Sequence, residues 1–401
     1  MVNKSSGELR VTEVLSRPDH FRFVELPYLL YRDDPNWVPP LRREETRRWD
    51  PACNATLASR PHWRFLAWRG DRVLGRISAS LDHDFSERWR PRSGFFGFFE
   101  CFDCPEAARL LFNAAERRLA SQGAREIIGP VNLTTQDEVG LLTAGFGDRP
   151  WILSPYNPEW YPRMLEAAGF APLRQYHAYA WSPQSRLEPA MESLCADRKR
   201  WAARIGVSFR KPEVRAWEVE LRSIHAIYNQ AFQHVWGYTA ISWLEFLQRA
   251  ERFKTFFSPD LVVLAEKKGE VVGFGLALPD INVLLQGLGG RLLPFGWIKL
   301  MAHSRNIRSA RYILLGVRPE LNGSGLGMLI TAEMLARARK LGIRAAELSI
   351  VDECNAPVRR IIGANGAVPV KSYTLYAKRT DADHTLKDDS ADGSAQGSCG
   401  Q

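Results

Sequence analysis

Three glycines at alternate positions, Gly323, Gly325 and Gly327, are the residues whose type and spacing most directly suggest chemistry in this chain. They follow a short apolar run that ends at Val317, and a helical pattern over residues 328–341 comes after them. Glycines let backbone amides approach an anion closely, and the dipole of the next helix favours a phosphate at its N-terminus. The stretch therefore predicts either a phosphate-binding loop or a tight turn, because a glycine loop by itself has both meanings.

The elements that must position this loop occur twice along the chain. Each set consists of a helix, a β-hairpin, a strand, a long helix, a further strand and a short helix. Gly75 and Gly273, at equivalent places in the two hairpins, are 198 residues apart, and so are Asn157 and Asn355. Equal order with equal offsets indicates a duplication.

The duplication predicts two domains, one over residues 9–190 and one over residues 191–379. Residues 1–8 are polar, and residues 380–401 are rich in Asp, Ser and Gly. We expect both of these tails to be disordered, because such compositions bury little apolar surface.

The two halves differ at the place of the glycine loop. Residues 100–105 of the first half have the sequence Glu-Cys-Phe-Asp-Cys-Pro there. This segment cannot present a row of backbone amides that approach an anion closely. We therefore expect only the second half to bind phosphate.

The second half also carries an apolar insertion over residues 283–301. Gly and Pro interrupt it, and its only charged residues are Arg291 and Lys299. It is too short and too interrupted to span a bilayer. It is either a buried core segment or an amphipathic flap that lies on a membrane or lines a long apolar pocket.

Composition limits the possible partners of the chain. The net charge of +9 favours anionic partners, but no run of five Lys or Arg and no zinc-finger spacing occurs, so we expect no nucleic acid. Cys101 and Cys104 form a single Cys-x-x-C without a second pair, so we expect no metal site. The absence of a signal-peptide pattern and of eighteen consecutive apolar residues predicts a cytoplasmic protein. The insertion leaves peripheral contact with the inner membrane open.

The order of elements over residues 215–378 resembles the GNAT superfamily of acyl-CoA-dependent N-acyltransferases, and residues 10–180 resemble it more weakly. In that superfamily the loop has Arg or Gln, two residues, Gly, any residue, then Gly or Ala, and its amides hold the pyrophosphate of coenzyme A. Gly325 and Gly327 match this pattern, whereas Asn322 stands where Arg or Gln is usual. The resemblance implies an α/β fold of two tandem GNAT-like domains, each a mixed, mostly antiparallel twisted sheet flanked by helices.

The same resemblance implies acyl-CoA as the acyl donor and no metal. Asn355 matches the Asn that often follows the next strand, and Ile362 stands where the superfamily commonly has the tyrosine that protonates the departing thiolate. The residues that the resemblance assigns to the donor are Val317, Asn322, Gly323, Ser324, Gly325, Leu326, Gly327 and Asn355.

The whole chain is also similar to a family of tandem GNAT-like bacterial proteins. The segments that carry this similarity are residues 31–40, 95–100, 155–158 and 347–349. Some proteins of this kind act as ceramide synthases in sphingolipid synthesis. The similarity implies transfer of a long-chain fatty acyl group from its CoA thioester to a sphingoid amine.

Transfer to an amine requires a group that removes a proton, because an amine must be neutral to attack a thioester. Glu347 and Glu353 lie in and just after the strand that follows the glycine loop. Asp137 and Glu138 lie in a polar loop that could face the second half across a shared cleft. The alternatives are structural: a solvated strand end for the two glutamates, and turn or helix capping for the loop.

The acid that Ile362 cannot supply could come from a tyrosine of the last strand. Tyr373 and Tyr376 are three residues apart, so their side chains face opposite sides of a strand and at most one reaches the cleft. Tyr373 is our candidate, and packing is the alternative.

Three functions therefore remain open on the sequence. The first is acyl-CoA-dependent transfer to an amphipathic or lipid-like amine. The second is acetyl transfer to a small polar amine. The third is a non-catalytic binding protein with the GNAT fold, which the departures at Asn322 and Ile362 suggest.

Overall fold

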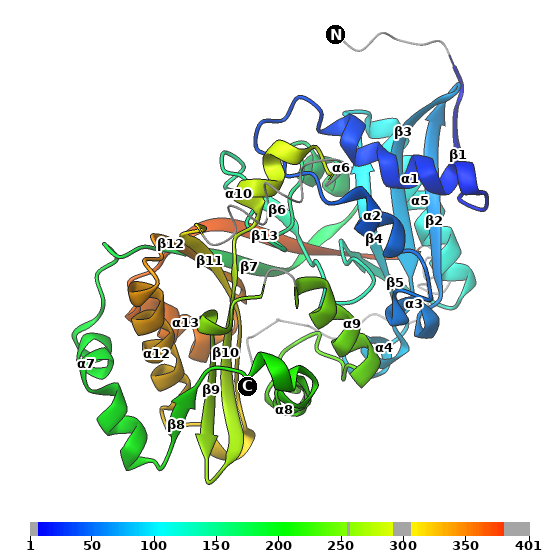
Figure 1. The fold of residues 1–401 in the computed structure, drawn as a ribbon. Coiled ribbons are helices and arrows are strands. Elements are labelled where there is room, and N and C mark those ends of the chain that lie inside the picture. Colours follow the sequence, from blue (N-terminus) through cyan, green and yellow to red (C-terminus); the bar gives the residue numbers. More distant parts are fainter. Residues whose placement is uncertain (1–6, 255–256, 292–305, 381–401) are drawn as a thin grey trace, which may run out of the picture.

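One continuous sheet of 13 strands crosses the whole molecule (Figure 1). The computed structural model describes residues 7–254, 257–291 and 306–380. The tails that we predicted to be disordered lie almost entirely outside these residues, as does the second part of the insertion over 283–301.

The first half contains the hairpin, strands and helices that its apolar periodicity predicts. Its first helix begins after Ser16, whose hydroxyl accepts a hydrogen bond from the Asp19 amide at 3.2 Å, an N-terminal cap. The elements are β1 (Leu9–Glu13), α1 (Arg17–Leu30), α2 (Arg42–Arg47), α3 (Ala55–Ser59), β2 (His62–Arg69), β3 (Arg72–Ser80), α4 (His83–Arg88), β4 (Ser93–Cys101), α5 (Pro105–Ser121), β5 (Glu126–Gly129), β6 (Leu141–Ala144), α6 (Tyr161–Ala167) and β7 (Ala171–Trp181).

The second half repeats this order after an additional helix, α7, and its helix before the hairpin is well capped. That helix, α9, begins with a complete capping box between Ser242 and Glu245. The helices and strands of this half are α7 (Pro189–Arg204), β8 (Ser208–Arg210), α8 (Trp217–Ala231), α9 (Trp243–Phe253), β9 (Val262–Lys267), β10 (Glu270–Pro279), α10 (Asn282–Leu285), β11 (Ser309–Val317), α12 (Leu326–Lys340), β12 (Ala345–Asp352), α13 (Ala356–Ala364) and β13 (Val368–Arg379).

The strand order is the same from either end of the sheet, as a duplication requires. It is β1-β2-β3-β4-β5-β13-β7-β12-β11-β10-β9-β8, and β6 pairs with β13. Each half gives its last strand to the other half, since β7 pairs with β12 and β13 pairs with β5. The exchange joins the two halves through one sheet. The predicted boundary at 190/191 falls within α7 and stays a prediction.

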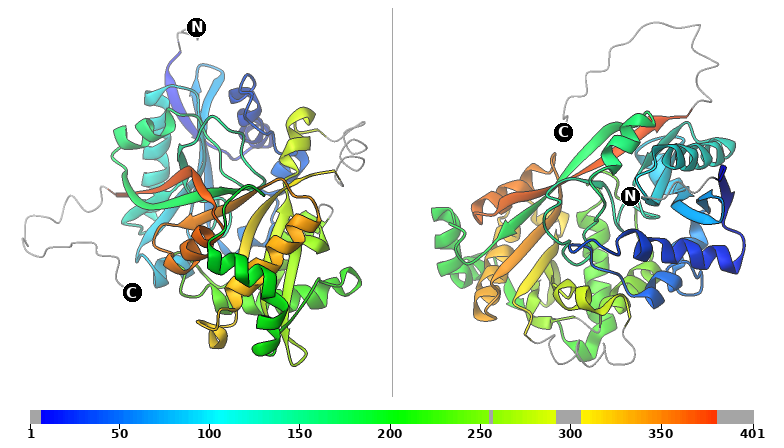
Figure 2. Two further views of the ribbon diagram at one scale, coloured as in Figure 1. Left: turned by 90° about the vertical axis from the view of Figure 1, so that its left-hand side faces the viewer. Right: turned by 90° about the horizontal axis from the view of Figure 1, so that it is seen from above.

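Helices cover both faces of the sheet in each half (Figure 2). In the first half α5 packs on β2 and β3, and α1 contacts β3 and β4. In the second half α12 packs on β9 and β10, and α8 contacts β10 and β11. Helix α9 contacts α3, and Arg60 of the first half donates a hydrogen bond to Glu245 of α9 at 2.6 Å. Helix α9 therefore bridges the two halves.

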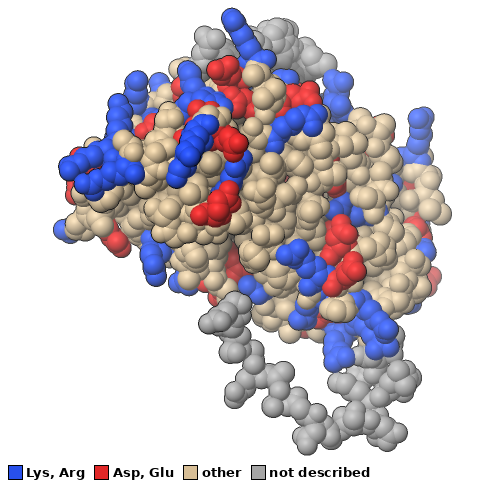
Figure 3. Space-filling view, turned by 90° about the horizontal axis from the view of Figure 1, so that it is seen from below, with Lys and Arg blue, Asp and Glu red and all other residues tan. Residues whose placement is uncertain are grey.

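The surface charge is mixed on the face that Figure 3 presents. Lys and Arg side chains lie scattered there among Asp and Glu side chains. The net charge of +9 is therefore not gathered into a single basic patch on this face.

Candidate active site between the two halves

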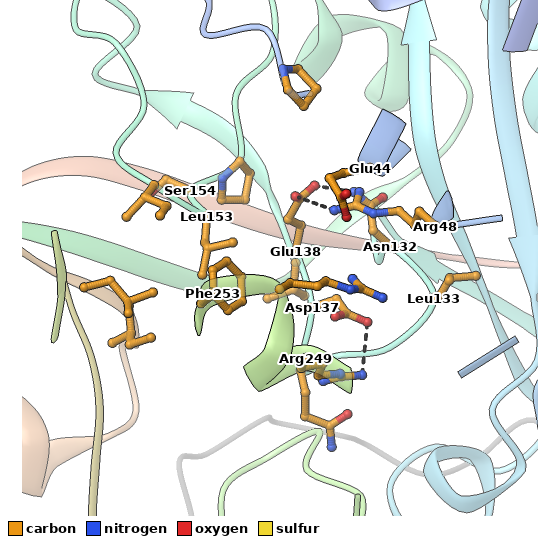
Figure 4. A pocket seen from close by; sticks show the side chains of 18 of the residues that line it. Glu44, Arg48, Asn132, Leu133, Asp137, Glu138, Leu153, Ser154, Arg249 and Phe253 are labelled. Carbon is orange, nitrogen blue, oxygen red and sulfur yellow. Dashed lines mark hydrogen bonds and ion pairs between the residues drawn. The ribbon is translucent and has the colours of Figure 1, made fainter. Parts of the chain in front are cut away.

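A cavity of about 1180 Å³ lies between the two halves. The second half supplies an apolar wall from α8, α9, β10, α10 and β11. The first half supplies α1, the segment after it and the polar loop after β5 (Figure 4). Representative apolar lining residues are Ile224, Phe253, Leu276, Leu278, Ile281 and Leu314.

The sheet opens into this cavity between β11 and β12. These parallel strands pair only from Ser309 with Ala345 to Tyr312 with Leu348, although both strands continue further. Beyond the last pair, Ile313 and Leu314 of β11 and Ser349 and Ile350 of β12 line the cavity. Strand edges without a partner strand offer amide donors to a ligand that enters the opening.

A buried ion pair lies at the base of the opening. Arg311 and Glu347 are partners across the parallel pair, and Arg311 Nε lies 3.6 Å from Glu347 Oε1. Glu347 Oε1 also accepts hydrogen bonds from Ser154 Oγ at 2.9 Å and Ser349 Oγ at 2.6 Å. Glu347 is 1% exposed and does not line the cavity, whereas both serines do. The candidate base Glu347 is therefore separated from the cavity by two hydroxyl groups.

The corresponding opening of the first half is closed by its own chain. Strands β4 and β5 pair only up to Phe95 with Ile128. Val131 then donates its amide to Phe96 O at 2.8 Å, and Asn132 Oδ1 accepts the Phe98 amide at 2.7 Å. A Cβ on Gly97 would lie 2.1 Å from Val131 O, so only glycine allows this close approach.

Asp137 and Glu138 line the polar part of the cavity (Figure 4). Glu138 accepts hydrogen bonds from Asn132 Nδ2 at 2.7 Å and from Arg48 at 3.4 Å. Asp137 forms an ion pair with Arg249 of α9 at 3.2 Å. The loop faces the second half across the cavity, as one of the two interpretations of the sequence expected, and the Glu138 side chain is 32% exposed.

A further carboxylate, Glu100 of β4, also lines the cavity. Its Oε2 accepts hydrogen bonds from Tyr31 at 2.7 Å and Tyr161 at 2.8 Å. Burial raises the pKa of Glu100 to about 7; the charge of Arg76 and the two tyrosine hydrogen bonds oppose this rise, and the charge of Glu138 adds to it. Our sequence reasoning did not single out Glu100 as a candidate for the site. The sequence feature that could have indicated Glu100 is a charged residue at the end of a phenylalanine-rich strand, residues 95–100.

The glycine loop lies at the far end of β11 and outside the cavity lining. Gly323 and Gly325 have φ of +79° and +80°, and a Cβ on either would meet no atom within 4 Å. Asn322, Gly323, Ser324 and Gly325 are exposed. Gly325 is the N-cap of α12 and has no side chain to cap it. The loop therefore presents an accessible helix N-terminus next to the opened strand.

The remaining sequence candidates lie away from the cavity. Glu353 is exposed just after β12, and Asn355 Oδ1 caps α13 by accepting the Val358 amide at 3.3 Å. Tyr373 is fully buried, its Oη has no hydrogen-bond partner among the described residues, and burial raises its pKa. Tyr373 and Tyr376 pack into different core clusters, as expected from their spacing.

The described part of the insertion packs against the first half. Gly290 O accepts the Arg42 amide at 3.1 Å, and Gln286 Nε2 donates to Pro35 O at 2.5 Å. Leu285 lines the cavity, as does Asn282 immediately before the insertion. This segment therefore belongs to the cavity wall, and the interpretation as a membrane flap concerns residues that mostly lie outside the described ones.

Solved structures with similar folds define the class of protein. A tandem GNAT protein from the clavulanic acid biosynthesis pathway superposes with a TM-score of 0.54 and 13% identity, over 93% of this chain and 99% of that one. A GCN5-related N-acetyltransferase from Sphaerobacter thermophilus gives a TM-score of 0.51 and 13% identity over 93% and 96%. The predicted tandem GNAT fold is confirmed.

Two curated relatives cover nearly the whole chain. Protein YghO of Escherichia coli is 32% identical over 94% of this chain and 97% of its own length. The bacterial ceramide synthase of Caulobacter vibrioides is 31% identical over 94% and 99%. No protein-family model matches the chain. The chain belongs to the family of these two relatives, within the GNAT superfamily, and it is an N-acyltransferase.

The fold implies a CoA thioester as donor and an amine as acceptor. Among residues 7–254, 257–291 and 306–380, no three His, Cys, Asp or Glu side chains are grouped to hold a metal ion. None of the helices in these ranges is both long and apolar enough to cross a bilayer.

Proposed function

We propose that this enzyme transfers a long-chain fatty acyl group from acyl-CoA to the amine of a sphingoid base or a similar lipid amine. The observation that carries the proposal is the cavity between the halves. Its volume of about 1180 Å³ exceeds the roughly 300–1,000 Å³ typical of pockets for drug-sized ligands, and one wall is apolar. An acetyl group with a small polar amine would leave most of this apolar wall in contact with water. The 31% identity to the bacterial ceramide synthase supports the same acceptor class.

We place the acyl-CoA donor along β11, from the glycine loop at the end of this strand to the opening beside β12. We assign its pyrophosphate to the loop from Val317 to Gly327, where the helix dipole and exposed amides favour an anion. We assign its thioester to the opening between β11 and β12, which reaches the cavity at Ile313 and Leu314. The closed opening of the first half supports a single donor site.

The reaction forms one C–N bond and breaks one C–S bond. The neutral amine attacks the thioester carbonyl, amides of the β11 edge stabilise the developing oxyanion, and the amine nitrogen loses a proton as the thiolate departs. We assign the removal of that proton to Glu138, because it faces the cavity and its charge acts on Arg311 at the base of the opening. The departing thiolate takes up a proton to give free coenzyme A.

The test is an assay of the purified chain with labelled palmitoyl-CoA and sphinganine, followed by mass spectrometry of the lipid product. We expect an N-acylated sphingoid base, and thermal stabilisation by palmitoyl-CoA that exceeds stabilisation by acetyl-CoA. Faster acetyl transfer to a small polar amine would support the second function instead. Absence of stabilisation by every CoA species would contradict both enzymatic functions and favour a binding protein.

A further inference from the structure

The proposed reaction leaves unused one feature of the first half, the largely buried carboxylate of Glu100, whose side chain is 15% exposed. It lies on β4 beyond the last residue that pairs with β5, where the chain has closed the opening with Val131 and Asn132. In the second half the equivalent region of β11 borders the donor opening. The first half therefore has a carboxylate facing the cavity at the place where the second half has the donor opening.

Glu100 is fixed from one side only. Tyr31 and Tyr161 both donate to Oε2, and the Tyr161 hydroxyl is itself held by the Cys101 amide at 2.7 Å. Oε1 accepts no hydrogen bond from a described residue. Arg76 Nη2 lies 3.9 Å from Oε1, at the limit of an ion pair, while Arg76 Nη1 donates to Phe23 O at 2.7 Å. One oxygen is thus positioned rigidly, and the other is left for a ligand.

The surroundings of Glu100 suit a cation with an apolar chain. Tyr31 stacks on Trp37 with ring centroids 5.0 Å apart, and Tyr156 lies 5.9 Å from Tyr31. Trp37 and Tyr156 line the cavity, and aromatic faces attract ammonium groups. Glu138 adds a second negative charge that acts on Glu100 across the polar part of the cavity. A bound ammonium between the two carboxylates would neutralise their repulsion.

We propose that Glu100 is the residue that selects an ammonium head group for the acceptor, holding it at the first-half end of the cavity while the acyl donor occupies the second half. This inference rests on the proposed function for its substrate class. It goes further by assigning the amine to the closed opening of the first half. A neutral alcohol of the same chain length would bring no positive charge to Oε1, which has only the distant Arg76 as a cation among the described residues, so the site discriminates against it.

The first experiment measures binding without catalysis. Dodecylamine, which is protonated at pH 7.5, and dodecanol are titrated calorimetrically into the wild-type chain, Glu100→Gln and Glu13→Gln. Glu13 is the matched control, since its carboxylate is ion-paired with Arg118 outside the cavity. We expect wild type and Glu13→Gln to prefer dodecylamine by roughly ten- to hundredfold, the size of a hydrogen bond to a charged group, and Glu100→Gln to lose this preference.

The second experiment separates this inference from the proposed reaction. In the acyl-transfer assay, Glu100→Gln should raise KM for the amine by roughly ten- to hundredfold and leave KM for palmitoyl-CoA unchanged. If Glu100→Gln does not fold, Tyr31→Phe keeps the carboxylate but removes one of its donors, and should lower the ammonium preference by roughly fivefold.

Equal preference in wild type and Glu100→Gln would overturn the inference. An equal rise in KM for both substrates would also overturn it. A wild-type chain that prefers dodecylamine through Glu100 but forms no acylated product would support the ammonium site and refute the proposed reaction.

Discussion

Replacement of Glu100 by Gln should make stability less dependent on pH. Burial raises the pKa of this carboxyl to about 7, against 4.5 for an exposed glutamate. The folded chain therefore keeps the proton to a higher pH than the unfolded chain does. By linkage, the free energy of unfolding contributed by Glu100 falls as pH rises from about 4.5 to about 7, and it is constant above that range. Glutamine does not ionise, so its contribution to the free energy of unfolding does not fall as pH rises. Its side-chain oxygen can still accept hydrogen bonds from Tyr31 and Tyr161.

The size of the effect follows from the same two values. They differ by 2.5, and each pKa unit corresponds to about 1.4 kcal/mol. Most of this difference develops between pH 5 and pH 8. The unfolding free energy of Glu100→Gln minus that of wild type should therefore rise by about 2 to 3 kcal/mol across this interval.

Urea denaturation of both proteins at pH 5, 6, 7 and 8 measures this difference. Glu13→Gln, which removes a carboxylate that is ion-paired with Arg118 outside the cavity, is measured at the same pH values as the control. Parallel curves for wild type and Glu100→Gln between pH 5 and pH 8, or a difference that falls with pH, would refute the assignment of a buried, proton-retaining Glu100.

Three further changes test the donor loop, the base and the cavity wall. Gly325→Ala (φ +80°) should cost about 1 kcal/mol of stability and weaken coenzyme A binding in calorimetry. Gly123→Ala, with φ +87° and equally open surroundings, should cost the same and leave binding intact. Glu138→Gln should lower kcat by roughly 10²–10⁴-fold with unchanged palmitoyl-CoA binding, and an unchanged kcat would exclude it as the base. Leu276→Trp fills part of the apolar wall and should shift donor preference from palmitoyl-CoA towards shorter chains, so an unchanged ratio would argue against an acyl chain on this wall.

Much of the fold follows from local pattern. The helical pattern predicted over residues 328–341 corresponds to α12 (Leu326–Lys340), and both predicted hairpins are present as β2–β3 and β9–β10. Side-chain periodicity and glycine placement act within one element, so a single sequence suffices to find them. The duplication also predicted the order of elements, because nearly equal offsets between similar segments indicate two units of the same architecture.

The exchange of the last strands could not be predicted in the same way. β7 and β13 would each satisfy their backbone hydrogen bonds against either half, and the local sequence does not distinguish the two partners. The choice depends on the packing of both halves at once, which joins them through one sheet.

The choice of candidate carboxylates also shows what can be predicted from local sequence and what depends on the tertiary structure. Asp137 and Glu138 were found because a polar loop directly after a strand is visible in the sequence, and they line the cavity. Glu347 and Glu353 were chosen for their nearness in sequence to the glycine loop, yet one is buried behind Ser154 and Ser349 and the other is exposed outside the cavity. Glu100 lies far from that loop in sequence. It lines the shared cavity because the two halves pack against each other in a symmetric arrangement, which the sequence does not show.

The repeat and the glycine loop could be read from the sequence, because they depend on residue type and on spacing along the chain, and the resemblance to the GNAT superfamily implied the class of fold. The tertiary structure decided which strand pairs with which half, that the opening of the first half is closed by Val131 and Asn132, and which carboxylates face the cavity. These depend on distances between residues separated by many positions. The physical reason is that burial and electrostatic interaction act through space, and spacing along the chain does not specify them.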